Sequence, residues 1–319
     1  MKNNNRPYRR PIEYRVYDLP EGFPILILSG DKWHISEVRS NRMHFHNCLE
    51  VGICHTDSGT MEFGGKSFPF RAGDVTVVSR NILHNTYSSP GESSLWTYVF
   101  MQPERLIPPY LRQSLNEAEL FSEIEQNICK IFPAAEYPQI YFFADRLAQN
   151  LDSKPLNYKT DVCALCVSLM IELMRLHSGN PFYEIGKNSD NALVLAPALD
   201  FLNDNYDKQF HIEKLADLCK MSLTHFRRVF GEIMGCAPLE FLHRMRVTHA
   251  RNLLRSTSLS VLHISERVGY ASISGFNRHF LDKTGYSPTA WRRDHLAAPR
   301  QHAATYSGWM EAEQFVVPP

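Results

Sequence analysis

The sequence predicts an α+β protein whose N-terminal third is β structure and whose C-terminal third is helical. Three observations support this prediction. Short alternating apolar runs separated by glycine turns lie near the N-terminus, the apolar spacing becomes helical after Tyr110, and a fifty-residue repeat occupies the C-terminal part. A chain of 319 residues is long enough for about two domains.

The N-terminal third shows the period of β-strands. Residues 60–70, TMEFGGKSFPF, contain two alternating runs joined by Gly64-Gly65, which is a hairpin pattern. Residues 73–79, GDVTVVS, are rich in β-branched side chains and leave a turn at Gly73. Both stretches are therefore expected to form strands.

From Tyr110 to about His177 the apolar residues follow a helical period, in LRQSLNEAELFSEIEQNICKIF and in ALCVSLMIELMRL. The stretch HSGNPFYEIGKNSD that follows is rich in Gly, Pro, Asn and Ser, as linkers are. The expected organisation is a first domain over 1–178, a linker over 179–191, a helical domain over 192–297 and a tail over 298–319.

Composition and charge restrict the class of protein. No run of about 18 apolar residues exists, the polar start MKNNNRPYRRPIEYR lacks a signal-peptide core, and the seven cysteines are scattered, so a cytoplasmic protein with reduced thiols is expected. The net charge is zero, but residues 197–296 hold 14 Lys and Arg against 10 Asp and Glu. This excess of positive charge suits an anionic partner.

The repeat relates HFRRVFGEIMGCAP to GFNRHFLDKTGYSP. The positions shared at an offset of fifty are Phe226 and Phe276, Arg228 and Arg278, Phe230 and Phe280, Gly235 and Gly285, and Pro238 and Pro288. Five identities at one spacing indicate two copies of one structural unit.

Each copy predicts a helix, a tight turn and a second helix. In the first copy Ser222 is a suitable N-cap, Phe226 and Phe230 lie on the inner face, and Arg227 and Arg228 lie on the outer face. Such a pair is a helix-turn-helix, whose second helix enters the major groove of DNA.

In the second copy Ser272 is the expected cap, and Ile273, Phe276, Phe280 and Leu281 form the expected inner face. Ser274, Asn277, Arg278 and His279 form the expected outer face. The turn, at Gly269 and Tyr270, is one residue longer than in the first copy. Between the copies, about 18 helical residues would span about 27 Å, near the roughly 34 Å between successive major-groove faces.

The last hundred residues resemble the AraC/XylS-type bacterial transcriptional regulators, through both F-x-R-x-F cores, both Gly-x-x-Pro stops, the RVTHARNLL connector and the Val-Gly-Tyr turn. The resemblance implies two helix-turn-helix units on promoter DNA. The residues expected at the DNA are Ser222, Thr224, His225, Arg227, Arg228, Ser272, Ser274, Asn277, Arg278 and His279. The chain departs from the pattern at Leu281-Asp282-Lys283, where such second units commonly carry more basic residues.

Other residues of the repeat have alternative roles. The repeated phenylalanines are expected to be core and to contact no base. Arg244, Arg246, Arg251 and Arg255 fit either a solvated helix face or phosphate contact.

In the N-terminal region, His44 and His46 share one side of a strand, with Glu50 and later His84 following. This HxHxxxE pattern resembles the cupin β-barrel, in which such residues converge inside the barrel. The resemblance leaves three roles open: ligands for Zn, Ni, Mn or Fe; polar lining for an organic effector; or a structural role. The apolar walls of an effector cavity would come from Trp33, Phe45, Phe63, Trp96 or Tyr98.

The combined expectation is a cupin-like effector domain with a helical dimerisation segment, followed by two helix-turn-helix units. The implied function is that of an effector-responsive regulator, with activation the commoner mode, and not that of an enzyme. Its partners would be promoter DNA, a small-molecule effector such as a sugar, RNA polymerase and a second copy of the chain, with no membrane. No cofactor is required, although a divalent metal fits the barrel. The alternative is a metal-dependent cupin enzyme or a metal-responsive regulator.

Overall fold

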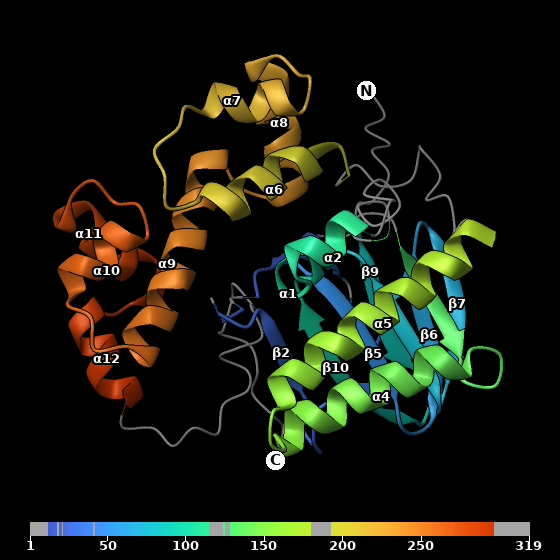
Figure 1. Cartoon of the computed structure of the whole chain (residues 1–319). Helices are drawn as coiled ribbons and strands as arrows, with labels where there is room; N and C mark the ends of the chain where they lie inside the picture. The colour runs from blue at the N-terminus through green and yellow to red at the C-terminus, as the bar shows by residue number, and fades with distance from the viewer. Residues whose placement is uncertain are drawn as a thin grey trace, which may run out of the picture.

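The computed structural model describes residues 12–296 apart from 18, 21, 41, 115–123, 125–127 and 180–192. The architecture is a mixed α+β one, with β-sheets in the N-terminal half and only helices in the C-terminal half (Figure 1). This arrangement confirms the expected fold class at that level. The linker beyond Gly179 and the tail over 298–319 lie outside the described residues.

Two sheets form the N-terminal half. The five-stranded sheet runs in the order β1-β4-β9-β6-β7, with β1 parallel to β4 and the other pairs antiparallel. The six-stranded sheet is built on the path β11-β8-β5-β10-β2, and β3 pairs with the outer part of β10. The strands are β1 Ile12–Arg15, β2 Ile25–Leu28, β3 His34–Ser36, β4 Met43–His46, β5 Leu49–Cys54, β6 Ser58–Phe63, β7 Lys66–Arg71, β8 Asp74–Val78, β9 His84–Ser88, β10 Ser93–Met101 and β11 Cys129–Pro133.

The predicted hairpin is confirmed. Strands β6 and β7 pair antiparallel from Ser58–Arg71 to Phe63–Lys66, and Gly64 and Gly65 between them both have positive φ, of 55° and 71°. Positive φ at both central positions is the type I′ geometry that matches the twist of the strands, and glycine adopts it without a Cβ penalty. The strand expected over GDVTVVS is β8.

Helices cover one side of the six-stranded sheet. The helices are α1 Pro103–Leu106, α2 Pro109–Ser114, α4 Pro138–Ser153 and α5 Tyr158–Gly179. Helix α4 packs on the sheet, with α5 beside it (Figure 1). Leu147 and Leu169 are fully buried there, in one core with Val51 and Val99 of the sheet.

One predicted helical segment is wrong. The residues CKIF at 129–132 form strand β11, which pairs antiparallel with β8 at the sheet edge. The isolated pattern of apolar residues fitted a helix, but pairing with β8 satisfies the backbone of this short segment instead, and Cys129 and Phe132 are buried.

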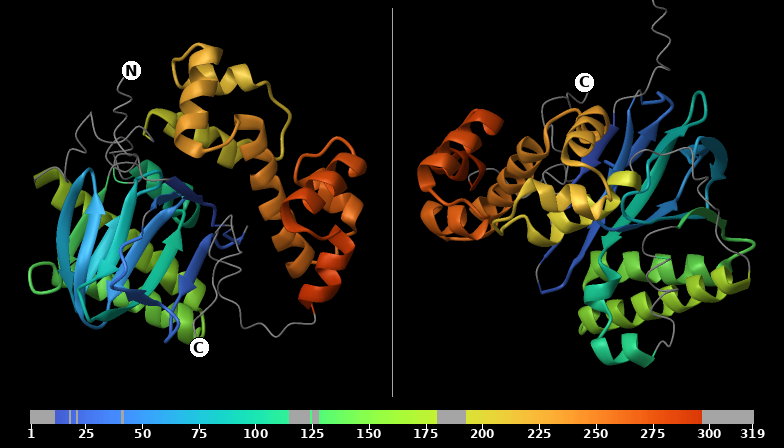
Figure 2. Two further views of the ribbon diagram at one scale, coloured as in Figure 1. Left: turned by 180° about the vertical axis from the view of Figure 1, so that it is seen from behind. Right: turned by 90° about the horizontal axis from the view of Figure 1, so that it is seen from above.

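The C-terminal half contains two helix pairs joined by one long helix. Its elements are η1 Leu193–Leu195, α6 Ala196–Asn205, α7 Ile212–Leu218, α8 Leu223–Met234, α9 Pro238–Ser256, α10 Val261–Arg267, α11 Ile273–Thr284 and α12 Pro288–Leu296. We call α7 with α8 the first helix pair and α10 with α11 the second helix pair. Helix α9 runs between them, so the second helix pair lies farther from the sheets than the first (Figure 2). None of the described helices combines the length and apolarity needed to cross a bilayer.

Candidate functional site

The two outer helices, α8 and α11, have matching ends. The Ser222 hydroxyl accepts from the backbone N–H of His225, and the Ser272 hydroxyl accepts from that of Gly275. Gly235 and Gly285 end the two helices in the left-handed conformation. These are the N-cap and C-cap arrangements that satisfy the free backbone groups at helix ends, and they confirm the predicted caps.

The inner face of α8 is core, as predicted, but the predicted inner face of α11 is core only in part, because Ile273 and Leu281 are 38% and 52% exposed. Phe226, Phe230, Phe276 and Phe280 are fully buried. The expected outer residues on these helices are exposed, except His279: Ser222, Thr224, His225, Arg227, Arg228, Ser272, Ser274, Asn277 and Arg278. Neither outer face is covered by another part of the described chain, so both remain accessible to a large anionic partner.

Arg228 belongs to a small polar group on the surface of α8. Its guanidinium lies 2.9 Å from the Glu232 carboxylate and 3.2 Å from Nδ1 of His225. The side chain of Arg228 is 57% exposed, so this ion pair is solvated and contributes little to stability. An arginine held in this way is oriented yet remains accessible for contact with a phosphate or a base.

His279 does not share the outer face with Arg278, which corrects the sequence prediction. Its ring lies 3.8 Å from the ring of His243 on α9 and 5.7 Å from that of Tyr270, and the side chain is half-buried. Burial is the main reason why the pKa of His279 lies below its ordinary value. A neutral imidazole packed on α9 suits a structural role better than contact with DNA.

The arginines of α9 have separate roles. Arg246 is buried and donates to the carbonyls of Tyr206 and Lys208, at 2.7 and 2.9 Å, so neither role expected from the sequence applies. The Arg251 guanidinium lies 4.5 Å from the centre of the Trp291 ring. Both side chains tie α9 to neighbouring elements, as amphipathic arginines can.

The departure at Asp282-Lys283 also has a structural explanation. The Lys283 ammonium lies 3.0 Å from Asp282 and 3.4 Å from Glu240 at the start of α9. Glu240 is paired in turn with Arg244 at 2.8 Å. Lys283 therefore joins the end of α11 to α9.

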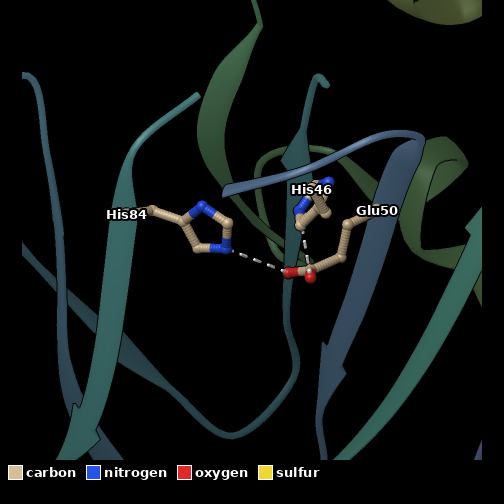
Figure 3. Close-up of side chains that lie close together, drawn as sticks. All are labelled: His46, Glu50 and His84. Atoms are coloured by element: carbon tan, nitrogen blue, oxygen red, sulfur yellow. Dashed lines mark ion pairs between the residues drawn. The ribbon is translucent and has the colours of Figure 1, made fainter. Parts of the chain in front are cut away.

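In the N-terminal half, His46, Glu50 and His84 come together in the interior. We call these three residues the histidine cluster. His46 on β4 and His84 on β9 belong to the five-stranded sheet, whereas Glu50 on β5 belongs to the six-stranded sheet (Figure 3). Each residue offers a ligand atom within 4.8 Å of the other two, and all three side chains are buried.

Hydrogen bonds set the orientation of both imidazoles. Nδ1 of His46 lies 2.8 Å from the Cys48 carbonyl, and Nδ1 of His84 lies 2.9 Å from the Ile82 carbonyl. A carbonyl only accepts, so in each ring Nδ1 carries the hydrogen and donates it. Each Nε2 then faces the Glu50 carboxylate, at 3.3 Å from His46 and 3.8 Å from His84. Neither Nε2 atom makes a hydrogen bond within the described part of the chain.

The charge states follow from burial and proximity. Burial lowers the pKa of His84 to about 4, so this imidazole is neutral at pH 7. Burial alone would raise the pKa of Glu50, but the contact with His46 and the charges of His46 and His84 outweigh it, and the net pKa lies below its ordinary value. At neutral pH the cluster thus presents a carboxylate and at least one neutral imidazole.

The other residues predicted for this site lie beside the cluster or away from it. His44 pairs with His84 across β4 and β9, and their rings are 4.1 Å apart, but it is not among the three residues with converging ligand atoms. Trp96 is buried in a separate core cluster, where its indole N–H donates to Ser94. Trp33 packs against a third core cluster.

Aromatic residues missed by the sequence reasoning lie nearest to His46. The rings of Phe100 and Tyr17 lie 5.8 and 6.1 Å from that of His46 and stack on each other at 3.8 Å. The alternation of β10 carries the signal for Phe100, because Trp96, Tyr98 and Phe100 share one face of that strand and stack in sequence. Trp96 is therefore two rings removed from His46.

The comparisons with known proteins concern both halves. Residues 215–294 match the family model described as a helix-turn-helix domain. The lactose operon transcription activator of Staphylococcus xylosus is 24% identical over 234 residues, which cover 73% of this chain and 80% of that protein. The transcriptional activator RhaS of Escherichia fergusonii is 24% identical over 256 residues, covering 78% of this chain and 87% of the relative. The DNA-binding domain of AdpA, solved with a target DNA, is 33% identical, with a TM-score of 0.33, over 34% of this chain and 97% of that one.

Proposed function

We propose, from the premise that this chain carries an AraC-type helix-turn-helix domain, that it is an effector-responsive transcriptional regulator with two DNA-reading units. The first and second helix pairs are those two units, and α8 and α11 are their reading helices. The observation that carries the proposal is that both helices present an exposed face bearing an arginine at the same position of the repeat, Arg228 and Arg278.

The connecting helix gives the two units a suitable separation. Helix α9 has 19 residues, hence a length of about 28 Å, close to the roughly 34 Å that separates major-groove faces on one side of B-DNA. Most of the remaining outer residues are polar and suit base edges or phosphates. His279 is left out of the proposed contact set because it packs against α9.

The test is to replace Arg228 and Arg278 with Ala, singly and together. A duplex selected from a random-sequence library with the wild-type chain serves as the probe, and affinity is measured by fluorescence anisotropy over a range of salt concentrations. Each change should cost about 1 to 3 kcal/mol of binding, and loss of a phosphate contact would lower the salt slope by about 1. Arg293→Ala is the control, because that side chain is 78% exposed but lies on α12. Wild-type affinity in the double variant would refute the assignment.

For regulation, we propose transcriptional activation in response to a small molecule of the sugar class, in the cytoplasm, through a homodimer that contacts RNA polymerase. The support is the overall similarity to relatives named as activators, one of them for a lactose operon. Thermal-shift screening with sugars, sugar acids and aromatic acids tests this, because a ligand that binds the native state raises its apparent stability. The two sheets are proposed to form the cupin-like barrel that receives the effector.

A second candidate is a metal-responsive regulator, and the histidine cluster favours it. Two imidazoles whose Nδ1 atoms are fixed by carbonyls, and whose Nε2 atoms lie close to each other and to a buried carboxylate, are a suitable donor set for a divalent transition metal. His46, Glu50 and His84 would hold the metal, and His44 is the nearest candidate for a further ligand.

The metal-binding hypothesis is tested by titrating the purified protein with Zn²⁺, Ni²⁺, Mn²⁺ and Fe²⁺ and measuring the bound metal after dialysis. One equivalent bound by the wild type and lost in His84→Ala would support it. The control is His34→Ala, since His34 is exposed on β3. Binding that persists in His84→Ala would show that the histidine cluster is not the site.

A further inference from the structure

The two halves of the chain share one buried core. Tyr14 and Phe45 of the sheets and Leu83, which directly precedes β9, belong to the same cluster of buried residues as Leu199 of α6 and Phe241 of α9. All five side chains are at least 95% buried. We call this shared core and the polar contacts around it the docking contact.

Three polar contacts surround this core. The Tyr14 hydroxyl donates to the Asn203 side chain at 2.9 Å, and the Asn81 amide donates to the Asp200 carboxylate at 2.8 Å. The Arg80 guanidinium lies 3.6 Å from the same carboxylate of Asp200. Asp200 and Asn203 both lie on α6, so this helix receives every polar contact described here.

Strand β4 and the segment between β8 and β9 contribute to the docking contact and also position His46 and His84 of the histidine cluster. On β4, Phe45 lies between His44 and His46, so strand alternation places Phe45 in the docking contact and His46 in the interior. In the segment after β8, the Asn81 N–H donates to the His46 carbonyl at 2.8 Å. That segment ends at His84, whose Nδ1–H donates to the backbone carbonyl of Ile82. A shift of either histidine therefore acts on residues that touch α6 or α9.

An aromatic row continues from the docking contact to the first reading helix. The ring centre of Phe45 lies 4.7 Å from that of Tyr14, and the ring centre of Tyr14 lies 5.3 Å from that of Phe241. The ring centre of Phe241 lies 5.5 Å from that of Phe230, which in turn lies 5.4 Å from that of Phe226; both Phe230 and Phe226 belong to α8. Close-packed rings transmit a displacement, because their contacts leave little free volume.

The second helix pair lacks this connection. Its core, which includes Phe276, Phe280 and Trp291, contains no residue of the sheets among the described buried side chains. Of the described residues, it shares with the first core only the partly buried Tyr206.

We propose that the docking contact couples the histidine cluster to the first helix pair alone. Occupation of the cluster changes the positions of β4 and of residues 80–83, and thereby changes how firmly α6 and α8 are held against the sheets. The second helix pair binds DNA without this control. The biological role of this coupling rests on the proposed regulator function, but the docking contact itself can be measured without DNA.

The first experiment is hydrogen–deuterium exchange of the full chain without DNA. Asp200→Asn should raise the exchange rate of the α6 amides at least threefold relative to the wild type, because the half-buried carboxylate accepts from Asn81 and faces Arg80. Asp204→Asn is the matched control, being the same change on an exposed residue of the same helix. Equal α6 exchange in the two variants would show that the docking contact does not hold α6 in solution.

The second experiment perturbs the cluster from inside the sheets. Glu50→Gln keeps the shape but removes the charge that faces both Nε2 atoms, and it should change α6 exchange by a similar factor while α10 and α11 remain unchanged. His84→Gln gives the same test if Glu50→Gln does not fold. An unchanged α6, or equal changes in α6 and α11, would overturn the coupling.

DNA binding separates this proposal from the proposed function. Glu50→Gln should change the affinity for the selected duplex in the wild-type background but not in the Asp200→Asn background. A wild-type chain that binds no duplex would refute the regulator function, whereas the exchange results would still decide the coupling. Equal effects of Glu50→Gln in both backgrounds would overturn the coupling and leave the regulator function intact.

Discussion

The first and second helix pairs are built on the same plan but are held in place differently. Both outer helices, α8 and α11, begin at a capping serine and end at a left-handed glycine, and both bury two phenylalanines one turn apart. The first pair shares its core with the sheets, through Tyr14 and Phe45. The second pair is closed by α9 and α12, through Val247 and Trp291.

The polar anchors differ in the same way. Around the first pair they run from α6 to the sheets, at Asp200 and Asn203. Around the second pair they stay within the helical half, where Arg292 donates to the carbonyls of Leu254 and Leu259. Among the described residues, the core of one copy of the duplicated unit thus includes side chains of the N-terminal half, and the core of the other does not.

The largest expected difference between the pairs comes from the buried phenylalanines. Phe230→Ala and Phe280→Ala should each destabilise the local core by about 3 to 5 kcal/mol, because each ring is fully buried. Only Phe230→Ala should also raise amide exchange in β1 and β4, since its core continues into the sheets. Native-state hydrogen exchange resolves the regions separately, which a single unfolding midpoint does not. Equal exchange of β1 in the two variants would contradict the comparison.

Acidification offers a second comparison, between the sheets and the part of α9 that packs against the second helix pair, where His243 contacts Tyr270 and His279. Burial lowers the pKa of both His84 and His243 to about 4 in the folded chain. The unfolded chain therefore binds more protons between pH 6.5 and pH 4, and stability falls as the pH drops through that window. For the fully buried His84 the loss between pH 7 and pH 5 is about 2 kcal/mol, whereas for His243, which is only half-buried, solvent screening makes it smaller.

The check is thermal unfolding at pH 7 and pH 5, in the wild type and in His84→Gln. In His84→Gln the unfolding temperature of the N-terminal half should depend less on pH than in the wild type. In His243→Gln the pH dependence of that unfolding temperature should stay as in the wild type. A pH dependence unaltered by His84→Gln would place the titrating group elsewhere. Glu50 adds to the loss only at lower pH, because its pKa lies below its ordinary value.

Local features were predictable from the sequence because local rules fix them. The capping serines, the paired glycines of the β6–β7 hairpin and the faces of α8 and α11 all depend on residues within one or two turns. The repeat provided a second, independent example of the same pattern of capping, buried and exposed residues. This is why α8, α11 and all of their expected outer residues except His279 could be placed in advance.

Features that depend on distant partners could not be predicted in this way. Residues 129–132 have an apolar spacing that fits a helix, and only their pairing with β8 makes them a strand. Arg246 carries a charge typical of a surface, yet its guanidinium satisfies two carbonyls 38 and 40 residues away. The contact between the two halves rests on Tyr14 and Asn203, which are 189 residues apart.

The histidine cluster lies between these two cases. The HxHxxxE spacing predicted that His44 and His46 share a side, and the register of β4 agrees. Which of the four residues converge depends on how the two sheets face each other, and this selects His46, Glu50 and His84. The nearest aromatic neighbours, Phe100 and Tyr17, come from strand pairings and segments that the spacing does not contain.

The smallest expected effects come from the two turns, where the repeat places different residues at one position. Lys220 and Gly269 occupy equivalent positions and both have positive φ, of 54° and 86°. A Cβ on Gly269 would lie 2.5 Å from the Asp207 carbonyl oxygen, so Gly269→Ala should cost at least about 2 kcal/mol from strain and collision together. Lys220→Gly should change stability by less than about 0.5 kcal/mol, because relief of strain in the folded state is offset by the greater freedom of glycine in the unfolded chain. Urea unfolding followed by exchange of the α7 and α10 amides would measure both. Similar costs at the two turns would mean that Gly269 is not packed against Asp207 in solution, and that the second helix pair is held by its core alone.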